Sequence, residues 1–172
     1  MLKGTPVALP EMLACREARV RQQQACLKQY KEPLISFCLN MPGPIKTSPE
    51  LRKAFDCGQT AILTALQKEA LPLLVRMERH ESTGDECLLA VKGEALKIKT
   101  MMTQIEETHP LGRLFDIDVL NPEGEKLSRP LPRRCLICGR QAQVCASRRL
   151  HSVAELTAKV EAILQDYFSR KN

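Results

Sequence analysis

The chain has 172 residues, of which 44% are hydrophobic and 27% are charged, and its formal charge is +6 at pH 7. This length predicts one domain that buries about 70% of its extended surface, enough for a core without disulfides. With no Trp, two Tyr and four Phe, the sequence has few aromatic side chains on which single-stranded nucleic acid could stack. The positive charge favours a negatively charged partner: a polyphosphate substrate, an acidic protein or nucleic acid.

Signals for export or membrane insertion are not evident in the sequence. The first ten residues lack the apolar core of a signal peptide, and no apolar run approaches the ~18–20 residues that span a bilayer. We therefore expect a soluble, cytoplasmic protein. In that compartment the eight cysteines are expected to be thiols or metal ligands and not a disulfide framework.

The spacing of apolar residues predicts helices and strands in a mixed order along the chain. In chain order we expect a helix over 13–30, a strand over 34–39, a helix over 49–69, strands over 71–78 and 86–91, a helix over 95–107, a strand within 109–120, a short strand over 125–127 and a helix over 153–170. This order predicts an α+β fold, with a mixed sheet and flanking helices.

Local signals define several of these boundaries. Ser48 is a favourable N-cap with Pro49 at the first helical position. The His-Pro dipeptide at 109–110 is expected to stop the third helix. Residues 81–85 and 121–124 have the composition of turns.

The stretch from His109 to Leu120 carries the strongest functional signal. Side chains alternate faces along a strand, so Asp116 and Asp118 share one face, with Cα atoms about 6.5–7 Å apart. At this spacing both carboxylates can bind one hard cation such as Mg²⁺. Arg113 lies just upstream, where a cation neutralises the charge of a departing phosphate group. The pattern is typical of a metal-dependent phosphoryl or nucleotidyl transferase.

A purely structural interpretation of this strand stays open, because two aspartates often lie on the solvated face of an amphipathic edge strand. Two features favour function. Leu114 and Leu120 are expected on the aspartate face, so that face is not uniformly polar. The His-Pro and Gly-Arg dipeptides also place a turn and a cation beside the carboxylates.

Cysteines near the C-terminus have the spacing of metal ligands. Cys135 and Cys138 form a Cys-x-x-Cys pair followed by a glycine, and Cys145 and His151 come next. Three thiolates and an imidazole complete a tetrahedral zinc site of the structural type, which can order a short polar segment. The alternative is that some of these cysteines are small buried hydrophobic residues. We predict a zinc knuckle in a basic insertion over 129–151.

Several motifs, in order along almost the whole chain, match a known family. They are Arg16-Glu17-x-Arg19 with Gln23, Pro42-Gly43-Pro44-Ile45-Lys46, Glu106-x-x-His109-Pro110-Leu111-Gly112-Arg113, Asp116-Ile117-Asp118-Val119, Pro122-Glu123-Gly124-Glu125, and Pro132-Arg133-Arg134-Cys135-x-x-Cys138 with Cys145 and His151. In these motifs the chain resembles the citrate lyase holo-acyl-carrier-protein synthase family, also called the apo-citrate lyase phosphoribosyl-dephospho-CoA transferases.

The resemblance implies a nucleotidyltransferase-like fold and a defined reaction. Members of this family transfer the phosphoribosyl-dephospho-CoA group from triphosphoribosyl-dephospho-CoA to a serine of the apo acyl carrier subunit of citrate lyase, and diphosphate leaves. Asp116 and Asp118 would hold Mg²⁺ on the triphosphate, and a carboxylate would favour deprotonation of the serine hydroxyl.

The resemblance also implies substrate contacts. Arg113 and Lys46 are the first candidates for phosphate contacts, and Arg16 and Arg19 are the second. Gly43 would let the backbone approach a phosphate closely. For Lys46, an exposed lysine with no such role is the alternative.

Two further residues are candidates by resemblance. Glu106 and His109 would complete the metal shell or orient the attacking hydroxyl, and the alternative for His109 is a turn residue. The stretch between residues 129 and 149 contains six arginines and no acidic residue. They are candidate docking residues for an acidic carrier, with a solvated surface as the alternative.

Two other functions remain open. A zinc-knuckle module whose basic arm binds nucleic acid explains the cysteine segment and the charge, but leaves the Asp-x-Asp strand unused, because carboxylates repel a phosphate backbone. A nucleotidyltransferase acting on a small molecule is the second. Mg²⁺-dependent triphosphate binding would distinguish an enzyme from the module, and competition by dephospho-CoA ligands would distinguish the two enzymes.

Overall fold

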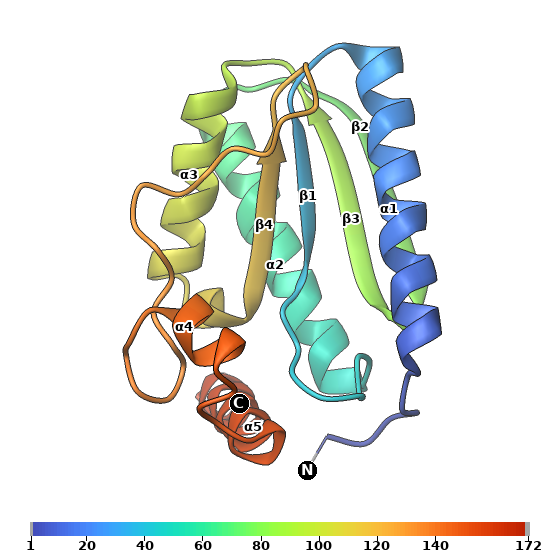
Figure 1. Ribbon diagram of the computed structural model, residues 1–172. Helices are drawn as coiled ribbons and strands as arrows, with labels where there is room; N and C mark the ends of the chain where they lie inside the picture. The colour runs from blue at the N-terminus through green and yellow to red at the C-terminus, as the bar shows by residue number, and fades with distance from the viewer. Residues whose placement is uncertain (1, 171–172) are drawn as a thin grey trace.

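An antiparallel sheet with helices on both faces is the frame of the computed structural model, which describes residues 2–170 (Figure 1). The strands are β1 (Leu34–Leu39), β2 (Leu73–Glu81), β3 (Gly84–Val91) and β4 (Phe115–Leu120). The helices are α1 (Leu9–Tyr30), α2 (Pro49–Lys68), α3 (Ala95–Thr108), α4 (Ala142–Ser147) and α5 (Val153–Ser169), with a 3₁₀ turn over Gly112–Leu114. The α+β class is confirmed.

The order of strands in the sheet is β2-β3-β1-β4, and each neighbouring pair is antiparallel. The predicted mixed sheet is therefore wrong. Helix α2 connects β1 to β2, and α3 connects β3 to β4, but each connection passes over one strand position. The strands that run in the same direction are thus separated by an antiparallel neighbour, as in split β-α-β units.

One face of the sheet packs against α2 and α3. Phe37 of β1 stacks on Phe55 of α2 with ring centroids 4.9 Å apart, and meets Phe115 of β4 edge-on at 5.5 Å. Gly58 permits this close approach, since a Cβ there would lie 2.4 Å from the Phe37 ring. The aromatic cluster fixes the first residue of β4, directly before Asp116, against the core.

The opposite face is only partly covered. Helix α1 packs on β1 and β3, where Cys26 meets Leu34, Leu88 and Ala90 in a smaller core. Figure 1 shows α1 on the β3 side of the sheet, away from β4. The first part of β4 on this face is therefore only partly buried.

Most predicted elements are confirmed, with shifted ends. The strand over 34–39 and the turn over 121–124 are present, and Ser48 caps α2 by accepting a hydrogen bond from the Leu51 N–H at 3.2 Å. Helix α1 begins at Leu9, earlier than predicted, because Pro10 occupies its first turn and Glu11 accepts the Ala8 N–H at 2.8 Å.

Two local predictions are wrong, and a third, the turn over 81–85, is confirmed with narrower bounds. The strand over 125–127 is reduced to an isolated bridge between Leu120 and Lys126, beside which the Leu127 N–H donates to the Val119 carbonyl at 2.8 Å. Leu114 lies in the 3₁₀ turn before β4 and packs into the α2 side of the core, so it is not on the aspartate face. The β2–β3 turn is shorter than 81–85, since Gly84 with φ +124° already pairs with Glu81.

Helices α4 and α5 lie together at the end of the sheet where β4 begins (Figure 1). Ser152 caps α5 in a capping box, accepting the Glu155 N–H at 3.1 Å while Glu155 accepts the Ser152 N–H at 2.8 Å. Among the helices of residues 2–170, none is long and apolar enough to cross a membrane.

Candidate functional site

The two aspartates of β4 lie side by side in the pleat, opposite Cys38 and Ser36 of β1. Asp116 and Asp118 are half-buried, whereas Ile117 between them is buried in the main core. Strand alternation thus separates the carboxylates from the apolar side chains. Both carboxylates line one cavity of about 640 Å³ at the outer edge of β4, which we call the aspartate groove.

A lysine marks the cation-binding character of this groove. The Nζ of Lys126 lies 2.7 Å from Oδ2 of Asp118, and the Lys126 side chain is 62% exposed. The ammonium group can swing into solvent and leave the carboxylate open. Two carboxylate oxygens in one groove are hard donors of the kind that Mg²⁺ prefers, so Asp116 and Asp118 fit this ion.

Two side chains of α3 hold the backbone of β4 between the aspartates. Oε1 of Glu106 accepts the Ile117 N–H at 2.8 Å, and Nζ of Lys99 donates to the Ile117 carbonyl at 3.2 Å. The outer edge of β4 has no further strand in the sheet of residues 2–170, so these side chains satisfy groups that a neighbour would otherwise pair.

Glu106 is the centre of a buried charge network. Its carboxylate lies 2.5 Å from Arg133 and 3.4 Å from Nε of Arg129, and the residue is 4% exposed. Burial raises the pKa of the Glu106 carboxyl, against the opposing charge of Arg133. Arg133 also donates to the Phe115 carbonyl. This carboxylate therefore supports β4, although it lines the aspartate groove as well.

The candidate phosphate-binding residues Arg16, Arg19 and Lys46 meet in a second cavity of about 130 Å³, together with Asp116. Nζ of Lys46 donates to the Met41 carbonyl at 2.6 Å, and burial together with the charge of Arg16 lowers the pKa of Lys46. We call this space the Arg16–Lys46 cavity. Asp116 lines both this cavity and the aspartate groove, so the two spaces meet at that residue.

Acidic partners already hold part of this cation cluster. Nε of Arg19 donates to Oε1 of Glu86 at 2.7 Å, and Arg79 lies 2.6 Å from the other oxygen of Glu86. Arg16 is exposed at the cavity, and the ammonium of Lys46 is half-buried beside it. Arg16 and Lys46 are therefore the more available cations of the cluster.

The remaining predicted residues lie elsewhere. Arg113 is half-buried, donates to the Arg134 carbonyl and lines a different cavity from the two aspartates. His109 packs between Phe115 and Tyr167, and its Nδ1 accepts the Leu111 N–H at 3.0 Å. Gly43 has φ +73°, and a Cβ there would lie 3.0 Å from Val153 of α5.

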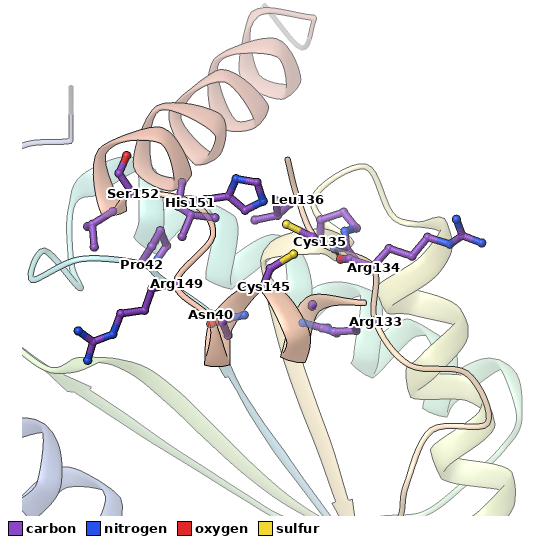
Figure 2. Close-up of a pocket in the computed structure, with 15 residues that line it drawn as sticks. Asn40, Pro42, Arg133, Arg134, Cys135, Leu136, Cys145, Arg149, His151 and Ser152 are labelled. Carbon is purple, nitrogen blue, oxygen red and sulfur yellow. Dashed lines mark hydrogen bonds between the residues drawn. The ribbon is translucent and has the colours of Figure 1, made fainter. Parts of the chain in front are cut away.

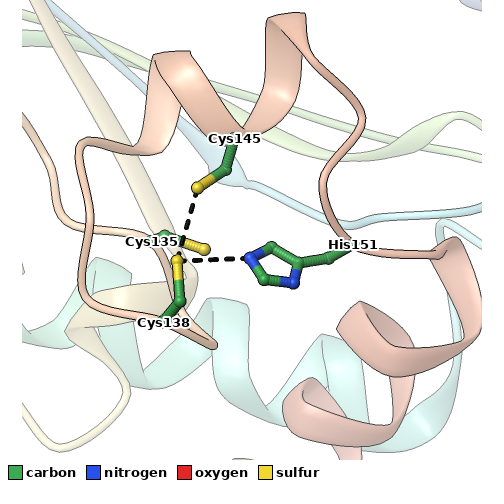
Figure 3. Close-up of side chains that lie close together, drawn as sticks. All are labelled: Cys135, Cys138, Cys145 and His151. Carbon is green, nitrogen blue, oxygen red and sulfur yellow. Dashed lines mark hydrogen bonds between the residues drawn. The ribbon is translucent and has the colours of Figure 1, made fainter.

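The four predicted metal ligands of the C-terminal segment come together, as Figure 3 shows. Their ligand atoms all lie within 4.8 Å of one another, with 3.4 Å between the sulfurs of Cys138 and Cys145 and 3.3 Å from Nε2 of His151 to Cys138. Zn–S and Zn–N bonds in a tetrahedral site separate ligand atoms by roughly 3.5–3.8 Å. The cluster can hold a metal ion such as zinc.

Local structure explains this convergence. Gly139 has φ +70° and donates its N–H to the Cys135 carbonyl at 3.3 Å, which closes the turn of the Cys-x-x-Cys pair. Helix α4 carries Cys145, and the segment before α5 carries His151. A backbone hydrogen bond at Arg140 and a side-chain bond with His151 lower the pKa of Cys138 to about 6, which favours the thiolate that binds metal.

Sequence reasoning missed Lys99 and Lys126. On α3, Lys99 lies on the buried stripe of Ile98, Met102 and Glu106. A lysine and a glutamate on such a stripe were a usable signal, because buried charges are normally paired. Lys126 gave no comparable signal, since its pairing with Asp118 depends on the turn after β4.

Proteins of one family are similar to this chain over almost its whole length. The profile of the family described as apo-citrate lyase phosphoribosyl-dephospho-CoA transferase matches residues 7–167. A protein of that name from Escherichia coli O1:K1 / APEC is 40% identical over 164 residues, covering 93% of this chain and 90% of the relative. One from Shigella boydii serotype 18 (strain CDC 3083-94 / BS512) matches with the same identity and coverage. The chain belongs to the apo-citrate lyase phosphoribosyl-dephospho-CoA transferase family.

Proposed function

We propose that this protein transfers the phosphoribosyl-dephospho-CoA group from triphosphoribosyl-dephospho-CoA to a serine of the apo acyl carrier subunit of citrate lyase, with release of diphosphate. The observation that carries the proposal within the structure is the pair of carboxylates, Asp116 and Asp118, in one groove beside a cluster of cations. A nucleotidyltransferase-type reaction needs both: a metal site and a separate phosphate-binding surface.

Asp116 and Asp118 would hold Mg²⁺, which supplies charge neutralisation on the triphosphate when bound. Arg16, Arg19 and Lys46 bind the phosphate oxygens from the adjoining cavity. The serine oxygen forms a bond to the α-phosphorus as the bond to the diphosphate breaks, and a carboxylate of the groove takes the hydroxyl proton. Glu106 acts through β4, because it holds the Ile117 N–H between the two aspartates.

We assign Arg113 a role away from the metal, at a separate cavity that it lines together with Arg134. Its guanidinium lines that cavity and binds the Arg134 carbonyl. Gly43 supports the loop against α5 in this proposal. His109 holds the turn before β4 through the Leu111 N–H.

Cys135, Cys138, Cys145 and His151 would hold a structural zinc ion within a single transferase domain over 1–172. The segment over 129–151 is then an insertion that the metal orders, since this polar stretch has little core of its own. Arg140 and Arg148 are exposed on it and serve as docking residues for the carrier. The reaction would take place in the cytoplasm.

The experiment that tests the function is the intact mass of the carrier subunit after incubation with this protein, Mg²⁺ and triphosphoribosyl-dephospho-CoA. The expected result is a mass increase equal to the phosphoribosyl-dephospho-CoA group. No increase on a carrier that a known active transferase does modify would refute the proposal.

Membership of a transferase family does not favour the nucleic-acid-binding module. That alternative requires a steeply salt-dependent affinity for DNA of random sequence, which a filter-binding titration measures. A nucleotidyltransferase for small molecules would instead show turnover with a nucleoside triphosphate that dephospho-CoA does not inhibit.

A further inference from the structure

A third cavity of about 600 Å³ lies between the Cys/His cluster, the first turn of α5 and the loop after β1. Figure 2 shows Cys135, Cys145 and His151 around it, together with Asn40 and Pro42. Its volume falls within the range of about 300–1,000 Å³ that small-molecule sites occupy. We call it the arginine-rimmed cavity.

The walls of this cavity are mainly apolar and its rim is cationic. Leu136, Val153 and Leu156 contribute aliphatic surface from three segments. Arg134 and Arg149 are exposed, and in Figure 2 their side chains extend on opposite sides of the cavity. None of the described residues that line it is acidic. An apolar interior with arginines at the edge fits a heterocyclic or aliphatic body that carries phosphate groups.

The arginine-rimmed cavity adjoins both spaces at the aspartates. It shares Arg133 and Ala142 with the aspartate groove, and Asn40 with the Arg16–Lys46 cavity. Asp116 lines both of those spaces. These shared residues place the arginine-rimmed cavity next to the two spaces that Asp116 lines.

We propose that the arginine-rimmed cavity binds the dephospho-CoA portion of the donor, with adenosine against the aliphatic walls and the diphosphate facing the cationic rim. This assignment rests on the proposed function, and it separates recognition of the nucleotide from chemistry at the triphosphate. It also explains the position of Arg113, which lines the nucleotide cavity and not the metal site.

The Cys/His cluster has a second role in this arrangement. Cys135, Cys145 and His151 line the cavity and also belong to the ligand cluster. A segment that holds these residues in place thereby forms one wall of the nucleotide site. The cluster contributes to donor affinity through the shape of that wall.

Isothermal titration with dephospho-CoA alone tests the inference. Val153 is 54% exposed and begins α5, where an acidic residue is compatible with the helix, so Val153→Glu places a negative charge in the cavity with little effect on folding. Ala154→Glu is the matched control, since it makes the same charge change one residue along α5, at an exposed position that does not line the cavity.

Dephospho-CoA is expected to bind the wild-type protein and Ala154→Glu with dissociation constants within about threefold of each other. Val153→Glu should raise the dissociation constant at least about tenfold, because the introduced carboxylate repels the diphosphate. Arg134→Glu, on the opposite rim, should do the same, and it provides an independent test if Val153→Glu melts at a lower temperature than the wild type.

Absence of dephospho-CoA binding to the wild type, or equal binding by Val153→Glu, Arg134→Glu and Ala154→Glu, would overturn the inference. The mass assay on the same preparations separates the two proposals. Transfer without dephospho-CoA binding refutes the nucleotide cavity alone, whereas dephospho-CoA binding without any transfer to a competent carrier refutes the proposed function.

Discussion

Asp118 is the residue at which the proposed metal site is most directly tested. Its carboxylate is half-buried, faces the aspartate groove and pairs with the exposed Lys126 at 2.7 Å. Removing its charge withdraws a metal ligand while leaving every core contact in place. A substitution at this position is therefore expected to change the reaction rate without changing the stability of the fold.

We expect Asp118→Asn to lower kcat by about 100-fold or more, since a bound metal contributes several kcal/mol and each 1.36 kcal/mol is about tenfold in rate. The rate of mass increase of the carrier subunit measures this, and thermal melting should show little change. Asp56→Asn, on the exposed side of α2, is the control and should retain full activity. Transfer by Asp118→Asn with unchanged Mg²⁺ dependence would rule out the metal assignment.

At the scale of an element, β4 depends on α3. Within the sheet of residues 2–170 the neighbouring strand of β4 is β1, and the outer edge of β4 is held at Ile117 by Glu106 and Lys99. The site's two carboxylates flank this attachment point. Their spacing is therefore set by β1 on one side and by α3 on the other.

Glu106→Gln should lower the free energy of unfolding by about 1.5–3 kcal/mol, because it leaves the half-buried Arg129 and Arg133 without their shared carboxylate. Urea titration measures this loss. Glu107→Gln is the matched control: Glu107 is 57% exposed and forms an ion pair with Arg129 at the surface, so its effect should stay within about 0.5 kcal/mol. Equal stability of the two variants would show that the Glu106 network does not support β4.

We expect the segment over 129–151 to depend in the same way on a metal ion at its Cys/His cluster. Cys138→Ser should release the metal and lower the melting temperature by about 5 °C or more, at about 2–4 °C per kcal/mol for a chain of this size. Metal content by plasma mass spectrometry and a thermal melt give both readouts. Cys57→Ser, outside the cluster on α2, should keep one metal per chain. A metal-free wild type whose stability equals that of Cys138→Ser would exclude the zinc site.

Across the whole molecule, part of the positive charge is paired inside the protein and part is exposed to solvent. Arg129 and Arg133 lie in the Glu106 network, whereas Arg140 and Arg148 are exposed. The stretch over 129–149 contains six arginines and no acidic residue. These arginines thus form two groups: an internal pair, Arg129 and Arg133, and an outer set of the other four. Within the outer set, Arg140 and Arg148 are the proposed docking residues for a carrier protein, since Arg134 and Arg149 line the arginine-rimmed cavity.

Reversing the charge of two outer arginines, Arg140→Glu with Arg148→Glu, should raise KM for the carrier about tenfold at low ionic strength and leave kcat unchanged. Exposed interface charges act mainly on association, and salt screens them. Steady-state kinetics at two salt concentrations measure the effect. Lys28→Glu with Lys68→Glu makes the same change in net charge on α1 and α2, and an equal rise in KM there would argue against a docking surface on 129–151.

Elements that depend on local chemistry can be predicted from the amino-acid sequence. The strand over 34–39 and the N-cap at Ser48 follow from side-chain pattern and capping chemistry. Alternation along β4 also placed Asp116 and Asp118 on one face, and the Cys-x-x-Cys spacing predicted a metal-binding turn. Each of these depends on residues a few positions apart, so no tertiary information was needed.

The way in which these parts pack together follows from long-range contacts in the folded protein. The connections through α2 and α3 each pass over one strand, and this makes every neighbouring pair antiparallel. The order of elements along the chain also allowed a mixed sheet. Long-range packing brought Lys99 and Glu106 to Ile117, turned Arg113 away from the aspartates, and formed the arginine-rimmed cavity from loops and α5. These contacts join residues far apart in the chain, and their free energies depend on burial and pairing that no local pattern encodes.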